Sequence, residues 1–204
     1  MADITLAMPF LLLNEDGKDQ KWFYQSQIEA IKGEDPGGET VHGIARKFWG
    51  SWAGWKIVDS FKGVTGFPQI LLNNATLDAL VSTFYKTNFW DKILGDQINA
   101  QVIATQVFDS AVNQGVGAAS GLIQNAINWV ENCVAVDGDL GPKTLSALNR
   151  LCFTAGNSGK ILDRFLELRR ARYQARAAQL QSEGSVEAND LPVWLARCVI
   201  PVVA

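Results

Sequence analysis

The chain has 204 residues, of which 48% are hydrophobic and 19% are charged, and its formal net charge is −3. This share of apolar residues excludes an intrinsically disordered chain, and the slight acidity argues against a duplex nucleic-acid binder, which is usually strongly basic. The charge balance therefore leads us to expect no nucleic-acid partner. No run of 18 or more apolar residues occurs in the sequence, so we also expect no membrane span.

The cysteine and histidine content limits the metal and redox chemistry of the chain. Cys133, Cys152 and Cys198 are odd in number and widely spaced, which favours reduced thiols over a disulfide framework. With His42 as the only histidine, a zinc site lacks its usual ligands, so we expect no metal and no cofactor. Asp3 stands where a signal peptide carries basic residues, so we expect synthesis in the cytoplasm without a signal peptide.

The first predicted element is a short helix over residues 3–15. Asp3 or Thr5 is its expected cap, and Pro9 is expected to kink it or to begin its second half. Residues 18–32 carry aromatic side chains at roughly helical spacing.

A turn-rich segment follows over residues 33–43. It holds four glycines and one proline, a composition that excludes a regular helix or a central strand. We therefore expect an ordered turn or a short β-hairpin near residues 34–44, whose backbone amides form a donor-rich surface.

Nearly all the later elements are predicted to be helical, so the fold class is mainly α. Trp49, Trp52 and Trp55 recur at every third residue, which places them on one face of any helix there. The small residues around Gly115 divide residues 98–130 into two closely packed helices. Three further helices have inward apolar residues: one from Asn74 or Thr76 (Leu77, Leu80, Val81, Phe84), one begun by Pro142 (Leu145, Leu148), and one over 160–181 (Ile161, Phe165, Leu168, Leu180).

Several stretches resemble glycoside hydrolase family 108: FLLLNEDG (10–17), DPGGETVHGI (35–44), FDSAVNQGVGAASGLIQNAI (108–127) and VDGDLGPKTLSALN (136–149). Members of this family are lysozyme-like N-acetylmuramidases, often encoded by phages and prophages. The family's second motif, Asp-x-Gly-Gly-x-Thr-x-x-Gly-Ile, is matched in full by Asp35, Gly37, Gly38, Thr40, Gly43 and Ile44. The resemblance covers about residues 4–200. It implies a lysozyme-like helical fold with a catalytic region at 1–95 and a helical peptidoglycan-binding-type region at 96–204, packed as one compact unit.

The family's first motif, Glu-Gly-Gly-Tyr, is only partly matched. Glu15 follows an apolar helix as the family's acid does, but Asp16 replaces the first glycine and no tyrosine follows. The gap from Glu15 to Asp35 is longer than in the family, and Glu29 lies closer to the usual spacing. We take Glu15 as the catalytic acid, with Glu29 as the alternative.

Cleavage of a glycosidic bond needs a proton donor and, opposite it, a carboxylate or an activated water. The resemblance implies that Glu15 is the general acid, whose pKa the site has to raise from the ordinary value of ~4.3. It also implies that Asp35 or Thr40 positions the water, although Asp35 is equally suited to capping its own turn. Glu39 is a further candidate for the second carboxylate.

The remaining candidate residues are expected to contact substrate. Gly37, Gly38 and Gly43 are expected to let a sugar approach the backbone, and His42 to serve a structural or substrate-edge role. Trp49 offers a stacking face, although tryptophans at helical spacing are more often core. Asn113 and Gln114 end a helix and are expected either to face the cleft or to serve as an ordinary C-terminal cap.

Three other patterns are weaker. The segment Asp137–Asp139 begins like a calcium loop, but Leu148 stands where such a loop needs glutamate. The arginines at 164, 169, 170, 172 and 176 are expected to form a solvated face, with contact to anionic wall polymer as the alternative. A cysteine peptidase would have to pair Cys133 with His42, and no flanking motif supports it.

These features favour a muramidase that cleaves the β-1,4 bond between N-acetylmuramic acid and N-acetylglucosamine in peptidoglycan glycan strands. The simplest form is a phage or prophage endolysin that depends on a holin or a similar release route to reach the periplasm or wall. The alternative is a non-catalytic wall-binding or secretion-helper protein that has kept the fold.

Overall fold

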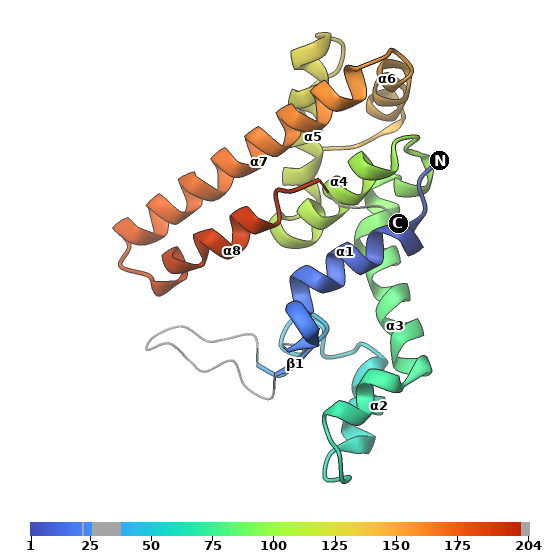
Figure 1. Ribbon diagram of the computed structural model, residues 1–204, viewed down its shortest axis with the longest axis vertical. Coiled ribbons are helices and arrows are strands. Elements are labelled where there is room, and N and C mark those ends of the chain that lie inside the picture. The colour runs from blue at the N-terminus through green and yellow to red at the C-terminus, as the bar shows by residue number, and fades with distance from the viewer. Residues whose placement is uncertain (22, 26–37, 201–204) are drawn as a thin grey trace. The chain divides into compact units, whose positions relative to one another are not determined.

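The computed structural model describes residues 1–21, 23–25 and 38–200 and confirms a mainly α, lysozyme-like fold with a small antiparallel sheet (Figure 1). The chain divides into two compact units. One is Leu11–Lys86, here named the hairpin unit, and the other joins Met1–Phe10 to Thr87–Ala204 and is named the bundle unit.

The first helix, α1 (Ile4–Asp16), agrees with the prediction to within one residue at either end. Asp3 is the cap, because its Oδ1 accepts hydrogen bonds from the backbone N–H and the hydroxyl of Thr5, both at 2.8 Å. Pro9 lies inside the helix. The helix ends before Gly17, whose φ of 73° a residue with a Cβ rarely adopts.

The sheet of the hairpin unit has three short antiparallel strands in the order β1 (Tyr24–Gln25), β2 (Thr40–Val41) and β3 (Ile44–Ala45). Val41 pairs with both Tyr24 and Ile44. The hairpin expected near 34–44 is therefore present at 40–45. Lys18–Gln20 form a 3₁₀ turn and Tyr24–Gln25 form β1, rather than the helix that the aromatic spacing over 18–32 indicated, because β1 pairs with β2.

The three tryptophans do not share a helix face, contrary to the prediction. The helix α2 (Gly54–Phe61) contains only Trp55, while Trp49 and Trp52 lie in the turns before it. The Trp52 ring packs on Gly54, the first residue of α2, where an added Cβ would lie 2.2 Å from the ring. Trp52 and Trp55 meet edge to face, with ring centroids 5.5 Å apart.

The hairpin unit ends with a 3₁₀ turn (Gln69–Asn73) and α3 (Ala75–Tyr85). Asn74 caps α3 by accepting the N–H of Leu77 at 3.0 Å. Leu77, Val81 and Phe84 are buried as predicted, and Leu80 is half-buried.

All the regular elements in the described part of the bundle unit are helical, and its helices α4, α5 and α7 pack on one another. The expected break falls at Gly115, whose φ is 91°, between α4 and α5. None of the helices in the described ranges is long and apolar enough to cross a membrane. The elements are a π turn (Lys86–Trp90), 3₁₀ turns (Asp91–Ile93, Gly95–Gln97 and Val186–Asp190), α4 (Gln101–Gln114), α5 (Val116–Val130), α6 (Pro142–Cys152), α7 (Asn157–Ser182) and α8 (Leu191–Ala196).

A buried ion cluster holds α4, α7 and the segment after α8 together. Asp109 is fully buried, and its two oxygens meet Arg169 at 2.5 Å and Arg197 at 2.8 Å. Burial acts to raise the pKa of Asp109, but the two guanidiniums outweigh it and hold the pKa below its ordinary value. The expectation that Arg169 belongs to a solvated face was therefore wrong, since its side chain is fully buried against Asp109.

Candidate active site

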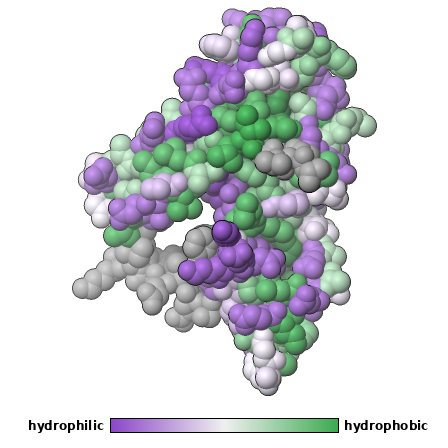
Figure 2. All heavy atoms as spheres, viewed as in Figure 1, coloured by the Kyte–Doolittle hydropathy of each residue, from purple (hydrophilic) through white to green (hydrophobic). Residues whose placement is uncertain are grey.

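The centre of the candidate site is the carboxylate of Glu15, in the last turn of α1. Glu15 is half-buried, and hydrophilic side chains gather over this end of α1 in Figure 2. A Cβ added to Gly43 would lie 2.6 Å from Glu15 Oε2 and 2.7 Å from the Tyr85 hydroxyl oxygen. The carboxylate therefore rests directly against Gly43, in a space that only glycine leaves open.

The turn that carries Gly43 has a backbone suited to this close approach. His42 and Gly43 join β2 to β3, and both have positive φ, at 46° and 75°. A two-residue hairpin of type I′ requires this conformation at both positions. The Tyr85 hydroxyl donates to the His42 carbonyl at 2.6 Å, so α3 fixes the turn from its other side. Tyr85 is 1% exposed and thus a rigid neighbour for the carboxylate.

A second link to α1 runs through the side chain of His42. Its Nδ1 lies 2.7 Å from Asp16 Oδ2, and both side chains are buried. Within the described ranges, His42 Nε2 and Asp16 Oδ1 have no hydrogen-bond partner. The pair joins the residue after Glu15 to the residue before Gly43, so it ties together the two sides of the site.

The candidate second carboxylate, Glu39, is held by charged and phenolic groups. Its oxygens lie 2.6 Å from Arg46 Nε and 2.9 Å from Lys62 Nζ, and it accepts the Tyr24 hydroxyl at 2.7 Å. Burial, followed by the bond to Glu39, raises the pKa of Tyr24 far above its ordinary range. These contacts give Glu39 the surroundings of a structural carboxylate that fixes the start of β2.

Asp59 completes this charged cluster beside Arg46 and Lys62. Arg46 donates to both of its oxygens, at 2.6 and 3.0 Å, and Lys62 lies 2.8 Å away. Hydrogen bonds from Arg46 and Lys62 lower the pKa of Asp59. The Arg46 guanidinium also lies over the Trp55 ring, 4.2 Å from its centroid, so the cluster anchors α2 to the hairpin.

A run of edge-to-face aromatic rings leads from this site to the surface. Tyr85 meets Phe84 at 5.2 Å, and Phe84 meets Trp49 at 4.8 Å, both measured between ring centroids. Trp49 is 39% exposed, and its carbonyl accepts the indole N–H of Trp55 at 2.9 Å. Of the three tryptophans in this segment, Trp49 is thus the one placed to offer a ring face to a ligand.

The remaining predicted site residues of the hairpin unit are only partly described by the structure. Glu29, Asp35 and Gly37 lie outside the described residues. Thr40 is buried in β2, with its hydroxyl 3.5 Å from the Gly38 carbonyl. No cluster of metal-binding side chains occurs in the part of the chain that the structure describes.

Asn113 and Gln114 belong to the bundle unit, at the end of α4, and line a cavity there. The exposed Cys133 also belongs to that unit, where its neighbour is Arg150, 3.8 Å from its sulfur. His42 is 5% exposed and occupied by Asp16, and these surroundings give no support to a cysteine peptidase reading.

Sequence reasoning missed Asp16 and Tyr85 as parts of the site. In the sequence Asp16 stands out only as a departure from the family motif, and its partner His42 lies 26 residues further along the chain. Tyr85 reads as an ordinary helix residue beside Phe84 and carries no local signal. Only the fold brings its hydroxyl to the His42 carbonyl.

Comparison with known proteins supports a glycoside hydrolase. The family model described as glycosyl hydrolase 108 matches residues 30–115, a range that contains the motif from Asp35 to Ile44 and begins after both Glu15 and Glu29. No curated protein matches the chain. Eight chains of solved structures match, among them SagA from Brucella abortus, with a TM-score of 0.55 and 22% identity over 97% of this chain and 95% of that chain. At this identity the likeness shows the fold alone, so the assignment to glycoside hydrolase chemistry depends on the residue 30–115 segment, which is similar to glycosyl hydrolase 108.

Proposed function

We propose that the protein is a peptidoglycan hydrolase, an N-acetylmuramidase that cleaves the β-1,4 bond between N-acetylmuramic acid and N-acetylglucosamine. The observation that carries the proposal is the position of Glu15. It lies at the end of an apolar helix, and its carboxylate contacts the motif residue Gly43. The glycosyl hydrolase 108 match over 30–115 supports the reaction class.

Glu15 is the proton donor in this mechanism. It is half-buried rather than enclosed, so a glycosidic oxygen can reach it from solvent. Gly43 presents no side chain, and this leaves room for the carboxylate itself to lie against the hairpin turn. Protonation of the leaving oxygen by Glu15 would break the bond to the anomeric carbon as that carbon takes on oxocarbenium-like charge.

The opposing group is a water rather than a second carboxylate of the described hairpin unit. Glu39 is tied to Arg46, Lys62 and Tyr24, and Asp16 is tied to His42. Thr40, or Asp35 from the same motif, remains the candidate to hold that water. Trp49 supplies a stacking face for a neighbouring sugar ring.

Purified wall sacculi test the proposal directly. A muramidase releases new reducing ends, and borohydride reduction followed by hydrolysis identifies them as muramic acid. New glucosamine ends would assign a different bond, and new amino groups would assign a peptidase. Release of neither sugar ends nor amino groups would support the non-catalytic wall-binding or secretion-helper alternative.

The position of the acid is tested by two matched variants, Glu15→Gln and Glu29→Gln. General acid catalysis contributes about 10²- to 10⁴-fold to rate, so Glu15→Gln is expected to lose activity by at least that lower factor while keeping its thermal unfolding midpoint. Glu29→Gln is expected to retain activity. The reverse pattern would show that Glu29 is the acid and Glu15 a surface residue.

A further inference from the structure

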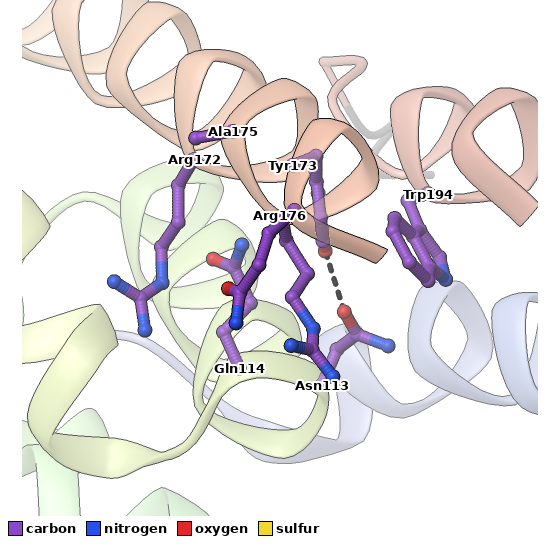
Figure 3. Close-up of a pocket in the computed structure, with 8 residues that line it drawn as sticks. Asn113, Gln114, Arg172, Tyr173, Ala175, Arg176 and Trp194 are labelled. Carbon is purple, nitrogen blue, oxygen red and sulfur yellow. Dashed lines mark hydrogen bonds between the residues drawn. The ribbon is translucent and has the colours of Figure 1, made fainter. Parts of the chain in front are cut away.

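The bundle unit contains a cavity of about 450 Å³ whose lining is rich in hydrogen-bond donors. It is bounded by the end of α4, by one face of α7 and by α8, and Figure 3 shows side chains from all three converging on it. The described residues that line it include two arginines and no aspartate or glutamate. The lining residues are Asn113, Gln114, Arg172, Tyr173, Ala175, Arg176, Gln179 and Trp194.

The orientation of the Asn113 amide follows from the hydrogen bonds beneath it. Arg169 donates to the Tyr173 hydroxyl oxygen at 3.0 Å, and a guanidinium has no acceptor to offer in return. The phenolic proton of Tyr173 is therefore free to be donated to Asn113 Oδ1, which lies 2.7 Å away. The oxygen of the amide is thus engaged, and the NH₂ group of Asn113 is what remains for a ligand.

Gln114 is arranged in the same way, since its Oε1 accepts the hydroxyl of Ser110 at 3.0 Å. Its NH₂ group has no hydrogen-bond partner among the residues that the structure describes. The scaffold below is rigid, because Tyr173 is 3% exposed and Arg169 is locked by the buried Asp109.

Arg172 and Arg176 lie one turn apart on α7 and are both exposed. Neither has an ion pair or hydrogen bond with any residue that the structure describes. Two like charges at this spacing repel each other slightly, so a bound anion would relieve that repulsion. Guanidinium groups also match carboxylates in shape and in donor geometry.

Trp194 adds an apolar wall. Its ring stacks on Tyr173 with centroids 5.8 Å apart and planes 29° from parallel. Two guanidiniums and two amide NH₂ groups beside such a ring suit a ligand that combines an anionic, acceptor-rich group with an apolar face.

We propose that this cavity binds a carboxylate of the wall polymer, carried either by the lactyl group of muramic acid or by the peptide stem attached to it. The identity of the polymer rests on the proposed muramidase function. The recognition itself rests on the donor lining and on the two arginines, Arg172 and Arg176, that have no partner among the described residues.

The test uses ligands that lack the β-1,4 bond between two sugars, so binding is measured independently of the proposed hydrolysis. Methyl β-N-acetylmuramic acid and a free stem tripeptide are titrated into the full chain by calorimetry, alongside the muramic acid derivative reduced to the alcohol. Binding of the sugar assigns the lactyl carboxylate, and binding of the tripeptide alone assigns the stem. Binding of the reduced sugar as tightly as the acid, or binding of neither carboxylate ligand, would overturn the proposal.

Arginine variants locate the site. Arg172→Gln with Arg176→Gln is expected to weaken binding by about tenfold or more, as expected for lost charge-assisted hydrogen bonds. The matched control, Lys160→Gln with Arg164→Gln, removes two charges from α7 outside the cavity and is expected to bind normally. Equal affinity of both double variants would place any carboxylate binding elsewhere. Sacculus hydrolysis by the wild-type chain tests the muramidase function separately. A failure of the carboxylate-binding proposal and a failure of the muramidase proposal can therefore be told apart.

Discussion

Replacement of Gly43 by alanine tests whether the hairpin turn sets the position of the Glu15 carboxylate. The φ of Gly43 is 75°, a conformation that costs a residue with a Cβ about 1–2 kcal/mol. The added methyl group would also lie 2.6 Å from Glu15 Oε2, against 3.4 Å for an ordinary contact. Since Tyr85 is buried and held by the His42 carbonyl, the half-buried Glu15 is the neighbour that yields.

The carboxylate therefore has to retreat by about 1 Å, and a misplacement of that size costs roughly 10²-fold in rate when the displaced group is catalytic. We expect Gly43→Ala to lose about 10²-fold in kcat for the release of reducing ends from sacculi. The free energy of unfolding, measured in urea, is expected to fall by at least the ~1–2 kcal/mol that the backbone demands, because the added Cβ also lies 2.7 Å from the Tyr85 hydroxyl oxygen.

Gly63→Ala is the matched control. Gly63 lies in the same unit with a φ of 83°, and no atom of the described residues lies within 4 Å of its added Cβ. It carries the same backbone penalty without the contact to Glu15, so it is expected to lose stability but to keep kcat within about twofold of wild type. Equal kcat in the two variants would refute the argument that Gly43 sets the position of the Glu15 carboxylate.

Three other parts of the structure can be tested in the same way: the pair of Asp16 and His42, the buried Asp109, and Trp49. Asp16→Asn and His42→Gln are each expected to lower the free energy of unfolding by about 1–3 kcal/mol, and the double variant is expected to lose less than the sum; strict additivity would mean that the two side chains are not coupled. Asp109→Asn is expected to cost about 3–5 kcal/mol at pH 7, because two buried guanidiniums lose their carboxylate. The pKa of Asp109 is lowered in the folded state, so its carboxylate stabilises the fold fully above the unfolded pKa of ~3.9 and stops doing so as the pH falls through the folded pKa. Urea unfolding should therefore show the free energies of unfolding of wild type and Asp109→Asn converging in acid. A difference that stays constant with pH would contradict the ion pairing of Asp109. Trp49→Ala is expected to raise KM about tenfold with little change in unfolding, whereas Trp49→Phe should restore most of the loss; an unchanged KM in the alanine variant would remove Trp49 from the substrate surface.

The helices were predictable from the sequence because their ends carry local signals. Asp3 and Asn74 accept backbone N–H groups at helix starts, and Gly115 takes a positive φ between two helices. Each of these effects depends on a few neighbouring residues, so a single sequence contains it. The turn at His42 and Gly43 was predictable for the same reason, within a glycine-rich stretch.

The tertiary role of the charged residues was not predictable to the same degree. Arg169 looks like one member of a basic run, yet it falls four residues after Phe165 and four before Tyr173, on the buried face of α7. That periodicity, together with a carboxylate at Asp109 inside an apolar run, is the signal that would have indicated a buried pair. The prediction that three tryptophans share one helix face failed for a different reason. A spacing of three residues places side chains on one face only where a helix forms, and here α2 begins at Gly54, after two of the tryptophans.

The departure from the family's first motif is the feature that the structure best accounts for. A glycine at position 16 would leave the buried side chain of His42 without the carboxylate that holds its Nδ1. Asp16 and His42 therefore belong together, and their contact joins the end of α1 to the turn that carries Gly43. Because Glu15 and Gly43 each stand next to one member of the pair, the contact between Asp16 and His42 helps to keep the Glu15 carboxylate close to Gly43. The motif mismatch at Asp16 thus counts less against the proposed role of Glu15 than the sequence alone suggested, and the coupling of Asp16 to His42 becomes a measure of how firmly the proposed acid is held.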